Sequence, residues 1–128
     1  MRELTKSITA SNLGIDNTPG KVEKENLEKL VKYVLDPLRE AWGAPIIVTS
    51  GYRCPRLNKA VGSQPTSQHR LGQAADIKTV EDTPARNKEL YDLIKKLKLP
   101  VDQCINEHGY DWIHVSYGPR NRRRFFAL

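Results

Sequence analysis

Two of the chain's three histidines, His69 and His114, lie in short motifs that also contain an aspartate. His69 precedes Asp76 in the run S-Q-H-R-L-G-Q-A-A-D (residues 67–76), and His114 ends the run D-W-I-H (residues 111–114). Imidazole and carboxylate are the ligands that catalytic zinc prefers, usually three from the protein with a fourth position left for water. His69, Asp76 and His114 are therefore candidate ligands of a zinc ion.

The spacing of His69 and Asp76 limits how they could share an ion. On one continuous helix the two side chains would lie about 10 Å apart, too far for ligands that each reach zinc at about 2 Å. A loop through Gly72, with Asp76 on the following strand, would bring them together, and His114 could complete the set from a neighbouring strand. A surface histidine and a capping aspartate would explain the same residues, so composition alone leaves both interpretations open.

A metallopeptidase also needs a carboxylate that takes a proton from the attacking water and passes it to the leaving amine. Asp111 and Glu107 both precede His114 closely enough to be candidates. Residues an odd number apart on a regular strand point to opposite faces, so either carboxylate requires a turn, which Gly109 makes plausible. The spacing alone does not choose between them.

Arg53 ends the motif S-G-Y-R (residues 50–53), directly after a β-branched run at 46–49. A guanidinium fixed at this strand-to-loop corner could stabilise a developing oxyanion or bind a substrate carboxylate. A surface ion pair is the more ordinary role of an arginine and would explain the same residue.

The elements that would position these residues follow from the spacing of apolar side chains. Apolar residues three or four apart over residues 27–42 predict a core-facing helix, which Pro37 should kink near Asp36 and Gly43 should end. A loop with one helical turn is expected at 54–68, and Thr83-Pro84 should begin a second amphipathic helix. Strands are predicted near residues 46–49, 74–78, 101–106 and 112–117.

This order of elements predicts a small α+β domain with a mainly antiparallel sheet flanked by helices. We expect residues 1–20 to form an irregular lead-in and residues 21–128 to form the single domain. A chain of 128 residues can bury a core without disulfides. We therefore expect Cys54 and Cys104 to be thiols in a reducing compartment, with a disulfide between them as the alternative.

The net charge of +6 favours anionic partners, and much of the excess lies at residues 120–124. No nucleic-acid module is recognisable, so we expect no nucleic-acid partner. We also expect the protein to be a monomer. The chain has no apolar run of about 18 residues, which argues against a membrane span. Its first residues lack the apolar segment of a signal peptide, so we expect synthesis in the cytoplasm and action on a cell wall only after release.

Three motifs, in this order, resemble the zinc D-Ala-D-Ala carboxypeptidase family, peptidase family M15. They are S-G-Y-R (50–53), S-x-H-x-x-G-x-A-x-D (67–76) and D-W-x-H-V-S (111–116). The family includes phage L-alanyl-D-glutamate endopeptidases and the dipeptidases of vancomycin resistance, and its fold is related to the signalling domain of Hedgehog proteins. The resemblance therefore implies a Hedgehog/DD-peptidase-like zinc-binding fold.

The resemblance also implies roles for the candidate residues. His69, Asp76 and His114 would bind one zinc ion. The family places its catalytic base three residues before the last histidine, which favours Asp111. Glu107 remains the alternative base, or a partner that orients a metal ligand.

Three further residues take roles from the same resemblance. Arg53 would polarise the scissile carbonyl and stabilise the oxyanion. Ser67 would line the substrate pocket or support the first zinc-binding histidine, and Trp112 would wall the cleft.

The implied activity is that of a zinc metallopeptidase that cuts the stem peptides of bacterial peptidoglycan. It would act as a D-Ala-D-Ala carboxypeptidase or as an L-Ala-D-Glu endopeptidase. Secreted members carry a signal peptide and often a wall-binding domain, and because neither is recognisable here we expect an endolysin-like role in phage or prophage lysis after release by a holin. One alternative is a catalytically silent zinc-binding module with a ligand- or partner-binding cleft. The other is a basic nucleic-acid or assembly protein of phage.

Overall fold

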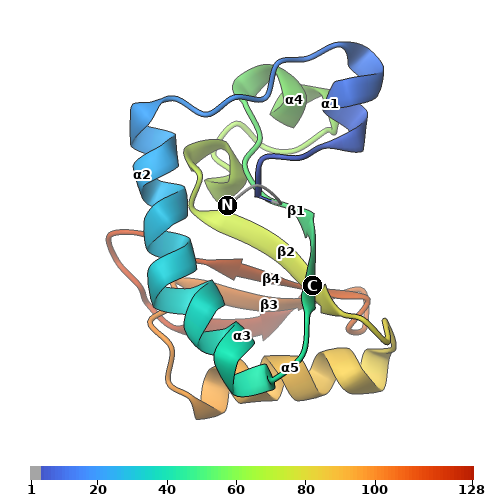
Figure 1. Ribbon diagram of the computed structural model, residues 1–128, viewed down its shortest axis with the longest axis vertical. Helices are drawn as coiled ribbons and strands as arrows, with labels where there is room; N and C mark the ends of the chain where they lie inside the picture. The colour runs from blue at the N-terminus through green and yellow to red at the C-terminus, as the bar shows by residue number, and fades with distance from the viewer. Residues whose placement is uncertain (1–3) are drawn as a thin grey trace.

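A five-stranded sheet forms the centre of the computed structural model, which describes residues 4–128 (Figure 1). The strands lie in the order β1-β2-β4-β3-β5, and all neighbours are antiparallel except β3 and β5, which run parallel. The expected α+β fold with a mainly antiparallel sheet is confirmed. The strands are β1 (Ile46–Ser50), β2 (Ala74–Thr79), β3 (Gln103–Glu107), β4 (Trp112–Ser116) and β5 (Arg124–Ala127).

The long helix predicted over residues 27–42 is present and changes its winding at the proline. It consists of α2 (Lys21–Leu30), the π-helical turn η2 (Val31–Leu35) and α3 (Asp36–Trp42). Pro37 has no N–H to donate, and its ring would clash with the carbonyl four residues back in an α-helix. The wider π turn before α3 accommodates this ring, and Gly43, with a φ of 73°, ends the helix as predicted.

Helices cover one face of the sheet and leave the other face for the candidate site. The second covering helix is α5 (Pro84–Lys96), which is capped by Thr83 as predicted. Burial of apolar surface in this layer is the main force that holds the fold together. The fully buried side chains of this core include Leu27, Leu30, Val34 and Leu38 from the long helix, Leu90 and Ile94 from α5, and Ala75, Ile77, Cys104, Ile113 and Val115 from the strands.

The N-terminal segment is more ordered than the sequence predicted. It contains α1 (Ile8–Leu13), so the expectation of an irregular lead-in is wrong there; residues 1–3 lie outside the described part of the chain. Leu4 is 2% exposed in the core, and its carbonyl accepts the backbone N–H of Tyr52. Asn17 donates its side-chain amide to the carbonyls of Thr5 and Tyr52. The segment therefore supports the chain just after β1.

Two short elements join β1 to β2. The expected helical turn is α4 (Pro55–Ala60), and η3 (Gln68–Leu71) is a 3-10 turn that the sequence analysis did not predict. Cys54 and Cys104 are both free thiols, and burial raises the pKa of the Cys104 thiol. Cys54 and Cys104 are therefore thiols, as expected, and the alternative of a disulfide between them is not found.

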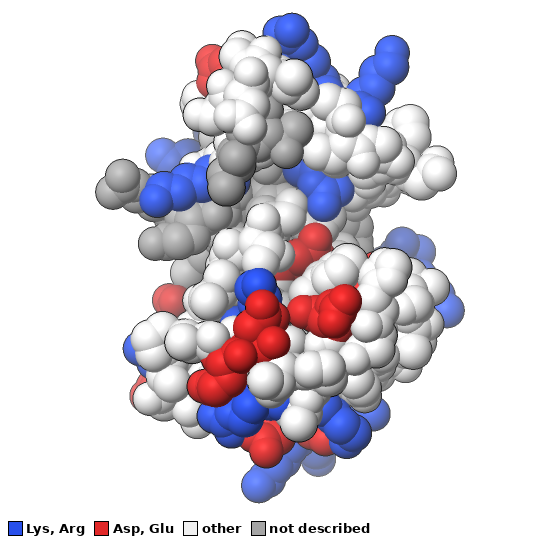
Figure 2. Space-filling view, turned by 90° about the vertical axis from the view of Figure 1, so that its right-hand side faces the viewer, with Lys and Arg blue, Asp and Glu red and all other residues white. Residues whose placement is uncertain are grey.

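The face of the molecule shown in Figure 2 is not uniformly basic. Acidic side chains gather in the middle of the face shown in Figure 2, and basic side chains lie around them. Within residues 4–128, no helix is both long enough and apolar enough to cross a membrane.

Candidate active site

Strand register brings four of the candidate residues to the uncovered face of the sheet. Asp76 of β2 lies directly opposite His114 of β4, and Glu107 of β3 lies opposite Trp112. Directly opposed residues of antiparallel strands point to the same face. The alternation that buries Ile113 in the core therefore places the half-buried His114 and Trp112 on the other side of the sheet.

His69 reaches this face from η3. The Ser67 hydroxyl accepts the His69 backbone N–H at 3.2 Å and begins the turn, and Gly72, with a φ of 72°, ends it. The His69 Nδ1 lies 2.7 Å from the Gly51 carbonyl oxygen. Because a carbonyl can only accept, Nδ1 carries the proton and Nε2 keeps its lone pair free for a metal.

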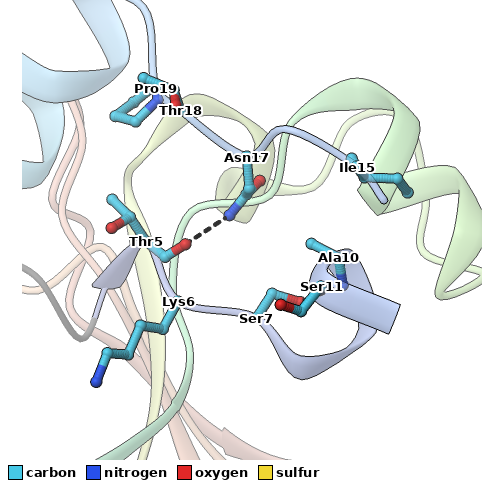
Figure 3. A pocket seen from close by; sticks show the side chains of 9 residues that line it. All are labelled: Thr5, Lys6, Ser7, Ala10, Ser11, Ile15, Asn17, Thr18 and Pro19. Carbon is cyan, nitrogen blue, oxygen red and sulfur yellow. Dashed lines mark hydrogen bonds between the residues drawn. The ribbon is translucent and has the colours of Figure 1, made fainter. Parts of the chain in front are cut away.

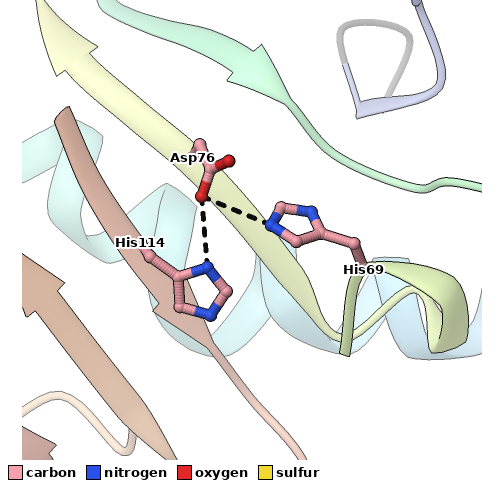
Figure 4. Close-up of side chains that lie close together, drawn as sticks. All are labelled: His69, Asp76 and His114. Atoms are coloured by element: carbon pink, nitrogen blue, oxygen red, sulfur yellow. Dashed lines mark hydrogen bonds and ion pairs between the residues drawn. The ribbon is translucent and has the colours of Figure 1, made fainter. Parts of the chain in front are cut away.

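The three candidate ligands lie at distances that suit a zinc ion. Oδ1 of Asp76 is 3.3 Å from Nε2 of His69 and 3.1 Å from Nδ1 of His114 (Figure 4). Ligand atoms at the corners of a tetrahedral zinc site are separated by about 3.3 Å. The donor atoms of all three residues lie within 4.8 Å of one another, so the set fits one metal ion.

The Asp76 carboxyl is held in its charged, metal-binding form. Its side chain is 11% exposed, and burial alone would raise its pKa. When the imidazoles of His114 and His69 are protonated, their hydrogen bonds to the carboxyl and their charges outweigh burial and hold its pKa below its usual range. Metal binding would replace these protons on the ligand nitrogens. A buried carboxylate between two imidazoles is a suitable set of ligands for zinc.

The two candidate bases are separated by the turn that joins β3 to β4. The Asp111 backbone N–H donates to the Glu107 carbonyl at 3.0 Å, which closes the turn and leaves the Asp111 residue exposed. Glu107 lines the cavity that contains the candidate ligands, whereas Asp111 does not. The preference for Asp111 is therefore not supported by the geometry, because Asp111 lies in the turn, outside the face that Glu107 shares with His114.

Two neighbours fix the charged groups around the site. Trp112 donates its indole N–H to Oε2 of Glu107 at 2.6 Å. The Arg53 Nε donates to the Ser50 hydroxyl at 3.1 Å, and its Nη2 lies 3.6 Å from Oδ2 of Asp76. Burial lowers the pKa of the Arg53 guanidinium, while the charges of Asp76 and Glu107 act in the opposite direction.

A comparison with protein families agrees with this geometry. Residues 1–116 match the sequence profile of the family described as Peptidase M15. The chain belongs to the peptidase M15 family. A comparison with curated proteins gives no significant match. Membership makes the protein a metallopeptidase of a zinc-dependent family, and its His/Asp/His group is a possible metal site.

The site of this M15 peptidase lies in a cavity of about 470 Å³. Ser67 and Trp112 line it, and His108 does not, while the roles of Ser67 and Trp112 in substrate binding stay predictions. The sequence analysis did not identify the polar lining residues Ser63, Gln64 and Thr66, because they lie in an irregular segment with no periodic signal. Alternation along β3 could have indicated Gln103 and Ile105. These unpredicted lining residues are Ser63, Gln64, Thr66, Gln68, Gln103, Ile105 and Leu128.

The M15 peptidase has a second, separate cavity of about 740 Å³ near its N-terminal segment (Figure 3). Residues from Thr5 to Pro19 line it, and none of them lines the site cavity. Asn17, which lines it, donates its side-chain amide to the carbonyl of Thr5 (Figure 3). This cavity contains no metal-ligating pair or paired carboxylates, so its lining suggests no chemistry.

Proposed function

We propose that this M15 peptidase is a zinc-dependent hydrolase of peptide bonds in the stem peptides of bacterial peptidoglycan. The observation that carries the proposal is the convergence of a His/Asp/His ligand set, a carboxylate and an arginine in one cavity. Membership of the family supports a peptidase, and the motif resemblance supports the substrate class.

In this proposal His69, Asp76 and His114 hold a single zinc ion. The free Nε2 of His69 and the ionised carboxylate of Asp76 are in the forms that metal binding requires. Zinc supplies Lewis acidity, which polarises a peptide carbonyl and makes a water easier to deprotonate.

Glu107 acts as the general base and acid. It takes a proton from the attacking water and delivers it to the amine that leaves when the peptide bond breaks. The indole N–H of Trp112 binds Oε2 of Glu107 and orients the carboxylate, so that Oε1 is left to meet the water.

Arg53 stabilises the negative charge that develops on the carbonyl oxygen. Its side chain is only 17% exposed and is held by Ser50 and Asp76, so it needs little reorganisation during the reaction. A donor fixed in advance at a site shielded from water contributes more than the same donor in solution.

Polar lining residues of the cavity support a stem peptide as the substrate, because their hydroxyl and amide side chains can bind a peptide backbone. The bond cut is either the terminal D-Ala-D-Ala bond or the L-Ala–D-Glu bond.

We also propose an endolysin-like role in phage or prophage lysis, in which the enzyme reaches the cell wall after release from the cytoplasm.

Mass spectrometry of purified muropeptides after incubation with the zinc-loaded protein tests the proposal. Loss of a terminal alanine would identify a carboxypeptidase, and cleavage between L-Ala and D-Glu would identify an endopeptidase. A chelated sample and the Glu107→Gln variant should leave the muropeptides intact. Intact muropeptides with the zinc-loaded native protein would contradict the proposal and favour a silent zinc-binding module.

A further inference from the structure

Strand β5 extends the site face of the sheet beyond the cavity. Arg124 and Phe126 lie level with Gln103 and Ile105 of β3 in the parallel pair. Level residues of neighbouring strands point to the same face, and Gln103 and Ile105 line the site cavity. Leu128, which continues the same alternation, also lines the cavity.

The alternate residue of β5 points to the opposite face, which confirms this orientation. Phe125 packs against the hydrophobic core, and its ring meets the ring of Tyr91 from α5 at 5.7 Å. Arg124 and Phe126 therefore lie on the uncovered side, where a peptide that leaves the cavity across β3 would pass.

Arg124 differs from the two arginines before it in the groups that it contacts. Arg122 is paired with Asp102 through its Nε at 2.8 Å, and the Arg123 Nε donates to the Leu99 carbonyl. Arg124 is exposed and has no ion pair among residues 4–128. Its guanidinium lies over the Phe126 ring, 5.7 Å from the centroid. Such stacking orients a guanidinium and leaves its N–H donors free for an anion.

We propose that Arg124, stacked on Phe126, forms a subsite for a carboxylate of the substrate peptide. The inference rests on the proposed function and adds to it a preference for anionic peptides. Arg124 lies two strands from His114 and two residues along β5 from Phe126, which is level with His114. At the usual strand spacing and rise this is about 12 Å. An extended peptide rises about 3.3 Å per residue, so the carboxylate belongs to a residue three or four positions from the cut bond.

The test uses zinc-loaded protein and matched stem peptides in which each free carboxylate in turn is amidated. We would measure kcat/KM for the native protein, for Arg124→Gln and for Lys24→Gln. Lys24 is the matched control, because it is exposed on α2 and its loss removes the same charge away from the site. Both substituted side chains are exposed, so both variants should fold.

Amidation of one carboxylate three or four residues from the cut bond should lower kcat/KM of the native protein about fivefold, mainly through KM. Lys24→Gln should show the same dependence, and Arg124→Gln should cleave both peptides at the rate of the amidated one. An Arg124→Gln variant that still discriminates, or a native protein that does not, would overturn the subsite while leaving the proposed function intact. A native protein that cleaves no stem peptide would overturn the proposed function and the subsite with it.

Discussion

At the residue scale, the function of Glu107 can be separated from metal binding. Glu107→Gln should lower kcat by about 10²- to 10⁴-fold, because the amide cannot take a proton from the water. The zinc affinity of this variant should change little, because Glu107 is not one of the three candidate metal ligands. Steady-state cleavage of a stem peptide and a competition titration with a zinc chelator measure the two effects.

Asp111→Asn is the matched control, since it also replaces a carboxylate by an amide of the same size. Asp111 is exposed and outside the cavity, so this variant should keep kcat within about twofold of the native value. The opposite result, with Asp111→Asn inactive and Glu107→Gln active, would show that Asp111 is the base.

The base could not be chosen from the sequence for a physical reason. Asp111 and Glu107 differ only in their place relative to a turn, and a shift of one residue in a hairpin moves a side chain to the other face. The candidate ligands were easier to identify, because their types and the motif around them are specific. The binding of zinc by them remains a prediction.

At the element scale, the close packing of η3 against α2 fixes His69. A Cβ on Gly72 would lie 2.4 Å from the Glu23 carbonyl oxygen, and the φ of 72° is unfavourable for other residues. Gly72→Ala should destabilise the protein by about 3 kcal/mol, from backbone strain and the steric clash together. It should also weaken zinc binding, because the turn that carries His69 must move.

Gly62→Ala is the control for the backbone term. Its φ is 75°, and a Cβ there would meet nothing within 4 Å. Gly62→Ala should therefore lose only about 1 kcal/mol of stability, from backbone strain alone. Urea unfolding of both variants measures the difference. Equal losses of stability would show that the contact between Gly72 and α2 is unimportant.

Elements with strong local signals were predicted, including four of the five strands, whereas β5 was not. The apolar spacing from Leu27 to Trp42 and the Thr83-Pro84 cap identified both long helices. Strand β5 is short and arginine-rich, and it forms by pairing with β3, about twenty residues earlier in the chain. Local propensity carries little information about such a strand, because its stability comes from cross-strand contacts.

At the scale of the whole molecule, Asp102 connects the site to the end of the chain. Its carboxylate accepts from the side chain of Arg122, just before β5, and from the Gln68 amide of η3 at 3.1 Å. Asp102 is 1% exposed, so Asp102→Asn should cost about 2 kcal/mol of stability at neutral pH through loss of the charged hydrogen bonds.

The same carboxylate predicts a pH dependence. Hydrogen bonds from Arg122 lower the pKa of Asp102 from the usual 3.8 to about 2, despite the opposing effect of burial. A lowered pKa in the folded state stabilises the protein above about pH 4, and this stabilisation is lost as the pH falls toward 2. Thermal unfolding between pH 2 and pH 7 should show a smaller pH dependence in Asp102→Asn. An unchanged profile would contradict the role of Asp102.

The basic surface near the end of the chain should help the protein adsorb to anionic wall polymer. The Arg123 Nε and Nη2 donate to the Leu99 and Lys95 carbonyls, so this arginine lies against the segment that carries the exposed Lys96 and Lys98. A combined Lys96→Gln and Lys98→Gln variant should sediment less with purified walls at low salt. Added salt should weaken adsorption of the native protein, because it screens exposed charges. Adsorption independent of both salt and these lysines would contradict the idea.

The most direct test of the claim that the protein is a metal-dependent peptidase is to measure how peptide cleavage depends on zinc. Metal-free protein would be titrated with zinc while cleavage of a stem peptide is recorded, beside Asp76→Asn as a variant of a candidate ligand. Cleavage should be absent without zinc, rise in proportion to added zinc up to one ion per chain, and stay far lower in Asp76→Asn. Cleavage that persists in the metal-free protein, or that does not respond to loss of the Asp76 carboxylate, would contradict a catalytic metal at this site.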